Sequence, residues 1–170
     1  MGERPVSTVS PYAQIAVLVV DDDTYLRKIV RSLLIGFGVQ RVYEAGDGAQ
    51  GLELLNQFRP DVLLVDWEMP MLNGAEMIRL VRDPANSPHA TTGIILMTAH
   101  TERHRIQQAM QLGINEMLVK PFSAKYLLQR LDLVVNHPRP FMQIGNYFGP
   151  MPRPARGAAN LGLAAEVAEA

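Results

Sequence analysis

Short apolar runs alternate along the chain with segments in which apolar residues recur every three or four positions. Five segments have the length and apolar character of strands: Ile15–Val20, Arg41–Ala45, Val62–Val65, Gly93–Met97 and Asn115–Val119. The spacing between them predicts helices over Leu26–Phe37, Asp47–Phe58, Gly74–Val81 and Glu102–Gln111. A last helix is expected to follow Ser123, as its N-cap, and to end near Val135.

Strict alternation of five strands with five helices predicts an α/β fold with a doubly wound parallel sheet. Parallel strands need crossover connections, and right-handed crossovers place helices on both faces of the sheet. The nearly continuous apolar strands agree with this, because a central parallel strand is covered on both sides. We therefore expect one domain over residues 15–137.

The two ends of the chain differ in character from this domain. Residues 1–14 are polar, and we expect them to form an N-terminal tail. Residues 138–170 are rich in proline and alanine, and we expect a mostly irregular C-terminal tail with no output domain. The tail contains Phe141, Tyr147 and Phe148, and two interpretations stay open: the rings pack back on the domain, or they dock a partner.

Composition removes several classes of protein. The formal net charge is −1, so neither nucleic acid nor an anionic membrane surface is an expected partner. There is no cysteine, which excludes disulfides, thiolate metal sites and a cysteine nucleophile. The N-terminus lacks the apolar stretch of a signal peptide, and the run Ile15–Val20 is too short to span a bilayer. We expect a cytoplasmic protein.

Acidic, hydroxyl and ammonium groups stand where four of the predicted strands end. The first strand is followed by Asp21, Asp22 and Asp23, and the other three ends carry Asp66, Thr98 and Lys120. In an open parallel sheet, ligands bind beyond the carboxyl ends of the strands. Crowded carboxylates repel one another unless a cation lies among them, and ligation by oxygen alone suits magnesium. Asp21, Asp22 and Asp66 are therefore candidate Mg²⁺ ligands.

The same set suits phosphoryl transfer. A carboxylate can attack phosphorus to form an aspartyl phosphate, and such a transfer needs positioning and charge neutralisation more than covalent help. Lys120 can neutralise a phosphoryl oxygen, and Thr98 can donate a hydrogen bond to another. Each residue alone has an ordinary interpretation; Asp23, for instance, can simply cap the following helix.

Four segments resemble the bacterial response-regulator receiver family: VLVVDDD at 17–23, LLVDWEMPMLNG at 63–74, LMTAH at 96–100 and LVKPF at 118–122. The resemblance covers about residues 15–136 and implies a flavodoxin-like (βα)5 sheet of strand order 2-1-3-4-5. It implies that Asp66 is the phosphoacceptor, that Thr98 is the switching hydroxyl and that Lys120 contacts the phosphoryl group. It further implies that Asp21, Asp22 and the backbone carbonyl of Glu68 ligate Mg²⁺ with Asp66, and that the Lys120–Pro121 bond is cis.

The function implied is that of a response regulator in two-component or phosphorelay signalling. Such a protein catalyses only its own phosphorylation and dephosphorylation, so it is not an enzyme in the usual sense. The implied partners are a histidine kinase or histidine phosphotransferase and a downstream protein target, with a homodimer as a further expectation. One position departs from the family: Met117 stands where an aromatic residue usually takes part in the switch.

Other interpretations of the sequence stay open at this point. Within the same fold, the chain could be an interaction module that binds its partner regardless of phosphorylation. The run GDGAQG at 46–51 matches the G-x-G-x-x-G fingerprint of dinucleotide-binding enzymes, although it follows the second strand. Asp21 and Asp23 match the D-x-D of haloacid dehalogenase-type phosphatases. Glu68 and His100 are expected either to flank the path of a hydrolytic water or to be solvated loop residues.

Overall fold

A computed structural model describes residues 9–153 and contains one five-stranded parallel sheet of order β2-β1-β3-β4-β5. The strands are β1 (Ala16–Val20), β2 (Arg41–Ala45), β3 (Val62–Asp66), β4 (Gly93–Thr98) and β5 (Glu116–Val119). The helices are α1 (Thr24–Gly36), α2 (Gly48–Phe58), α3 (Gly74–Val81), α4 (Arg103–Gln111) and α5 (Ala124–Asn136). This is the predicted flavodoxin-like α/β fold, and the element bounds lie within two residues of the expected ones.

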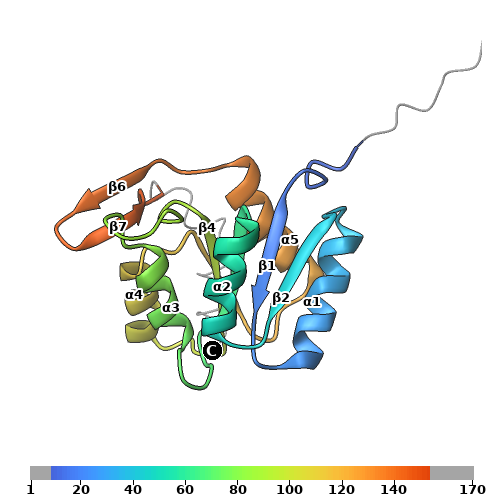
Figure 1. Ribbon diagram of the computed structural model, residues 1–170, viewed down its shortest axis with the longest axis horizontal. Helices are drawn as coiled ribbons and strands as arrows, with labels where there is room; N and C mark the ends of the chain where they lie inside the picture. Colours follow the sequence, from blue (N-terminus) through green and yellow to red (C-terminus); the bar gives the residue numbers. More distant parts are fainter. Residues whose placement is uncertain (1–8, 154–170) are drawn as a thin grey trace, which may run out of the picture.

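Helices cover both faces of the sheet and divide the core into two layers (Figure 1). One layer packs α2, α3 and α4 against the sheet, through residues such as Leu55, Ile78 and Ala109. The other packs α1 and α5 against the opposite face, through residues such as Leu34 and Leu131. Neighbouring strand residues are therefore buried on both sides, as their apolar runs predict. Within residues 9–153, no helix has the length and apolar character needed to cross a membrane.

The glycines that mimic a dinucleotide fingerprint serve helix packing. A Cβ at Gly48 would lie 2.7 Å from the carbonyl oxygen of Leu72, and one at Gly51 would lie 2.9 Å from Met77. Asp47, directly before Gly48, caps α2 by accepting a hydrogen bond from the backbone of Gln50. The motif is therefore explained by the close approach of α2 to its neighbours, and the dinucleotide interpretation loses its support.

Part of the expected N-terminal tail belongs to the domain. Tyr12 is buried beside α1 and α5, and its hydroxyl donates a 2.9 Å hydrogen bond to Asp132 on α5. The pKa of Tyr12 is raised to about 12. Burial is the main cause, and the hydrogen bond to the carboxylate of Asp132 adds to it. The domain therefore begins before residue 15.

The segment after α5 is also more ordered than the sequence suggests. β6 (Phe141–Ile144) and β7 (Tyr147–Pro150) form an antiparallel hairpin across the end of the domain next to α3 and α4 (Figure 1). Phe141 packs on Phe148 with their ring centroids 5.5 Å apart. The hairpin lies so close to Gly113 that a Cβ there would stand 2.3 Å from the carbonyl oxygen of Phe148. For residues 141–150 the expectation of an irregular tail is therefore wrong, whereas residues 154–170 of that expected tail lie outside the described residues.

Two arginines tie this extension to the sheet. Glu116 begins β5, and its side chain is only 3% exposed. Its carboxylate pairs with Arg153 and lies 3.9 Å from Arg139, and both arginines come after α5. A buried carboxylate is costly without a cation, so the extension stabilises the charge that β5 brings into the interior. A second contact places the guanidinium of Arg82 over the ring of Phe141.

Candidate functional site

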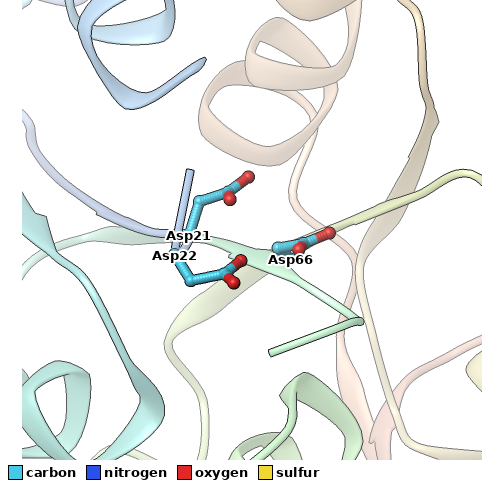
Figure 2. Close-up of side chains that lie close together, drawn as sticks. All are labelled: Asp21, Asp22 and Asp66. Atoms are coloured by element: carbon cyan, nitrogen blue, oxygen red, sulfur yellow. The ribbon is translucent and has the colours of Figure 1, made fainter. Parts of the chain in front are cut away.

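Three carboxylates converge at the carboxyl ends of β1 and β3, as the sequence predicts (Figure 2). Asp21 and Asp22 follow β1, and Asp66 is the last residue of β3. One oxygen from each of the three lies within 4.8 Å of the others. Asp21 and Asp66 are buried and Asp22 is exposed, so the cluster opens to solvent on one side. Asp23 is not part of it, because its side chain caps α1 through the backbone N–H groups of Tyr25 and Leu26.

Lys120 places a positively charged side chain beside these carboxylates. Its ammonium group lies 2.9 Å from Oδ2 of Asp21 and 2.9 Å from Oδ1 of Asp66. Lys120 follows β5 directly and precedes a cis peptide bond to Pro121, as expected. Burial favours the neutral amine, but hydrogen bonds to Asp66 and Asp21 outweigh it, so the pKa of Lys120 is raised. The lysine therefore keeps its charge between two carboxylates.

The position of Asp66 disfavours its ionised form. Burial raises the pKa of Asp66 to about 6, and the hydrogen bond from Lys120 only partly offsets this while the charge of Asp21 adds to it. A cation placed among the carboxylates would favour the ionised form. The site thus combines a poorly solvated carboxylate with charges that a divalent cation would balance.

We expect the Asp66→Asn variant to be more stable than the parent near pH 7. The carboxyl group has a pKa near 6 when folded and about 3.8 when unfolded, so the folded state binds more protons between these values. The contribution of Asp66 to stability therefore falls as pH rises from about 4 to 6, and removal of its charge should restore on the order of 1 kcal/mol above pH 6. Urea unfolding at several pH values without metal measures this difference. It should vanish near pH 4; a difference independent of pH would contradict the account.

Thr98 lies at the end of β4 and is 1% exposed. Its hydroxyl oxygen accepts a 3.0 Å hydrogen bond from the backbone N–H of His100, which leaves the hydroxyl hydrogen free to be donated. The carbonyl oxygen of Thr98 accepts from the backbone N–H of Lys120, which holds the ends of β4 and β5 together. The two side chains proposed to contact a phosphoryl group are therefore carried on adjoining strand ends.

Glu68 and His100 contact each other at the rim of the site. Nε2 of His100 lies 3.0 Å from Oε1 of Glu68, and Nδ1 lies 3.5 Å from Glu102. The sequence places both residues near Asp66 but does not indicate that they pair with each other. The pair links the loop after β3 to the loop before α4.

The donor set fits magnesium. The ammonium group of Lys120 pairs with two of the three carboxylates, which leaves excess negative charge at the cluster. Hard divalent cations prefer oxygen ligands. Asp22 can offer an oxygen from the open side, and Asp66 can offer one from the buried side. The backbone carbonyl of Glu68 as a further ligand stays a prediction.

Two residues near the site were not singled out from the sequence. Arg27, on the first turns of α1, donates a 2.6 Å hydrogen bond to the carbonyl oxygen of Asp21. The guanidinium group of Arg105 on α4 lies 5.4 Å from the centre of the ring of Trp67, which is the residue after Asp66. The sequence contains one indication of the role of Arg27, which is its position as a basic residue one helical turn after the acidic loop.

Met117 is buried in the layer that contains Ala109 and Leu112 of the α4 region. Its carbonyl oxygen accepts a 2.8 Å hydrogen bond from the buried guanidinium of Arg130 on α5. The thioether thus fills the interior beside α4, as expected for a flexible side chain.

Comparison with known proteins agrees with this geometry. Residues 17–132 match the family model of the response regulator receiver domain. The chain is 34% identical over 118 residues to the chemotaxis protein CheY of Pseudomonas aeruginosa, covering 69% of this chain and 94% of that protein. It is 31% identical over 121 residues to a probable CheY of Rhizobium etli, covering 71% and 92%.

Solved structures give the same result. CheY4 of Vibrio cholerae superposes on this chain with a TM-score of 0.66 at 33% sequence identity. The match covers 72% of this chain and 99% of CheY4. The receiver domain of a sensor histidine kinase from Pseudomonas aeruginosa, solved with a magnesium ion coordinated in its active-site cleft, gives 0.64 at 27% identity and covers 72% and 98%. As in the interpretation of the sequence, this class of protein is a phosphoacceptor rather than an enzyme with a separate substrate. The chain belongs to the response-regulator receiver family.

Proposed function

We propose that Asp66 accepts a phosphoryl group, with Mg²⁺ bound, from a histidine kinase or histidine phosphotransferase. The phosphorylated domain then changes its contacts with a downstream protein target in the cytoplasm. The observation that carries this proposal is the placement of a buried carboxylate, two further carboxylates and one ammonium group at a single sheet edge. Such a cluster suits phosphoryl transfer, which depends on positioning and charge neutralisation.

The proposed step forms one bond and breaks one. A carboxylate oxygen of Asp66 attacks the phosphorus of a phosphohistidine, and the phosphorus–nitrogen bond breaks with its electron pair moving to the histidine nitrogen. Lys120 moves from Asp66 to a phosphoryl oxygen, and Thr98 donates its hydroxyl hydrogen to another. Asp21, Asp22 and Asp66 would hold Mg²⁺, which would supply further positive charge near the phosphoryl oxygens. Water later attacks the phosphorus and releases inorganic phosphate.

An apolar groove beside Lys120 supports a protein as the phosphodonor. It has a volume of about 420 Å³ and is lined by Leu26, Ile29, Leu33, Ala99, Lys120, Pro121 and Phe122. Ile29 on α1 is 40% exposed although it belongs to an apolar stripe. Exposed apolar surface next to a reactive group is typical of a contact site for a protein partner.

Transfer from a phosphorylated kinase or phosphotransferase tests the proposal. Candidate donors from the same cell are labelled on histidine with ³²P and mixed with the protein or with Asp66→Asn. We expect the label to move to the parent chain within minutes with Mg²⁺ present, and not to the variant. Equal labelling of both chains would contradict Asp66 as the acceptor. Partner binding that is equal for the phosphorylated parent and Asp66→Asn would favour the phosphorylation-independent module.

A further inference from the structure

We propose that Arg27 is a positioning residue of the acidic site, which fixes the loop carrying Asp21 and Asp22 and thereby sets the affinity for Mg²⁺. The inference rests on the proposed function of that site and adds a residue outside its carboxylate cluster. Arg27 lies on α1, and its side chain is only 16% exposed. Nη1 donates the 2.6 Å hydrogen bond to the carbonyl oxygen of Asp21, and Nε lies 3.5 Å from a carboxylate oxygen of Glu44 on β2.

Arg27 completes the fixation of Asp21. The backbone N–H of Asp21 donates to the carbonyl oxygen of Ala45, and its two carboxylate oxygens accept from the backbone of Asp23 and from Lys120. The carbonyl oxygen held by Arg27 is the remaining polar group of this residue. Every polar group of Asp21 is therefore engaged, and the path of the backbone is set at this point.

Asp22 depends on this backbone more than on contacts of its own. Its side chain is exposed, and within residues 9–153 it makes no hydrogen bond to another protein group. The carbonyl group of Asp21 is joined directly to the nitrogen of Asp22, so a rotation of that peptide would swing the Asp22 carboxylate relative to Asp66. Arg27 holds this peptide with a charged donor, and hydrogen bonds to charged groups are stronger than neutral ones.

The charge of Arg27 acts on the loop and not on the cation. Glu44 orients the guanidinium group, and its positive end lies against the loop that carries two of the three carboxylates. A positive charge at this place would by itself oppose the binding of Mg²⁺. Arg27 therefore favours the cation through the geometry of the loop that it holds.

Arg31 provides a matched control. It lies one turn further along α1, approaches the same Glu44 at 3.8 Å and donates to the carbonyl oxygen of Val42. Like Arg27, it ties α1 to β2, but its contacts are with β2 and not with the acidic loop. A purely structural role of the α1–β2 contact would make the two arginines equivalent.

Magnesium chloride titrations test the proposal without any phosphodonor. Trp67, the only tryptophan, follows Asp66, so its fluorescence can report binding. We expect Arg27→Gln to raise the Kd for Mg²⁺ about tenfold, as loss of one charge-assisted hydrogen bond predicts. Arg31→Gln should change the Kd less than about twofold, and Arg27→Lys, which keeps the charge with a single donor group, should fall between them. Thermal unfolding without Mg²⁺ measures how far each variant is destabilised.

The outcomes separate this inference from the proposed function. An Arg27→Gln protein that is folded and binds Mg²⁺ like the parent would overturn the role of Arg27 and leave the site intact. Equal losses of affinity in Arg27→Gln and Arg31→Gln would reduce both residues to structural contacts. If Arg27→Gln does not fold, an unchanged Kd in Arg27→Lys overturns the inference. A parent chain that binds no Mg²⁺ would contradict the proposed function itself.

Discussion

Deletion of residues 138–170 is expected to lower the free energy of unfolding by about 3 kcal/mol, although the family match ends at residue 132. The deletion removes both cations that face Glu116 and the ring that covers Arg82. A carboxylate left without its partner inside a domain costs far more than an exposed pair contributes. Urea unfolding followed by circular dichroism measures the loss.

Two further chains make this prediction specific. A chain that ends at residue 157 keeps Arg139, Arg153 and the hairpin, so it should be more stable than the chain ending at residue 137 by about the same 3 kcal/mol. Glu116→Gln should destabilise the full chain but partly restore the shortened one, because the uncompensated charge is then gone. If the chain ending at residue 137 were as stable as the full protein, the extension would not be part of the folded unit.

Lys120→Gln is expected to slow phosphorylation by roughly a hundredfold, as loss of a preorganised charge at the reacting group predicts. Lys120 neutralises Asp21 and Asp66 in the resting site and is the ammonium group proposed to meet the phosphoryl oxygens. Its loss also removes the hydrogen bond that lowers the pKa of Asp66, so a smaller fraction of the nucleophile is ionised at pH 7.

The rate of mass gain with a small phosphodonor, followed over time, measures this effect. Lys125→Gln is the control, because this lysine is exposed on α5 and contacts none of the three carboxylates. Its rate should equal that of the parent. Asp66→Asn run in parallel gives the background. A Lys120→Gln protein that is phosphorylated as fast as the parent would remove the lysine from the mechanism.

The sequence predicts the site well because the fold converts strand ends into neighbours. Asp21, Asp66, Thr98 and Lys120 are far apart along the chain, yet each stands directly after an apolar run or at its end. Once the runs are interpreted as parallel strands of order 2-1-3-4-5, these residues must share one edge. Their distances and burial, and hence the raised pKa of Asp66, depend on side-chain packing that the pattern does not specify.

The prolines of the C-terminal segment obscure its hairpin in the sequence, because proline is typical of irregular segments. Pro138 and Pro140 precede β6, where proline does not interrupt a strand, and Pro150 lies at the end of β7. A local signal was present: Gly145-Asn146 separates two four-residue segments that contain aromatic residues, which is a hairpin pattern. The pairing of Glu116 with Arg153 could not be predicted, because it depends on where the hairpin docks.

The pairing of Arg27 with the backbone of Asp21 illustrates a second limit. Sequence patterns indicate which side chains carry reactive groups, whereas a long side chain can reach a backbone oxygen from many positions. The capping of α1 by Asp23 is one of the two interpretations that the sequence offers for this residue, because it depends only on neighbouring residues. Contacts that require a specific rotamer of a flexible side chain need the structure.

Intact mass after incubation with acetyl phosphate tests the central claim most directly. The parent chain and Asp66→Asn are each incubated with and without Mg²⁺. The account predicts that the parent gains the mass of one phosphoryl group only when Mg²⁺ is present, and that Asp66→Asn gains none. A phosphoryl group that appears on Asp66→Asn, or a parent chain that gains none from acetyl phosphate or from phosphorylated kinases and phosphotransferases, would contradict Asp66 as the phosphoacceptor.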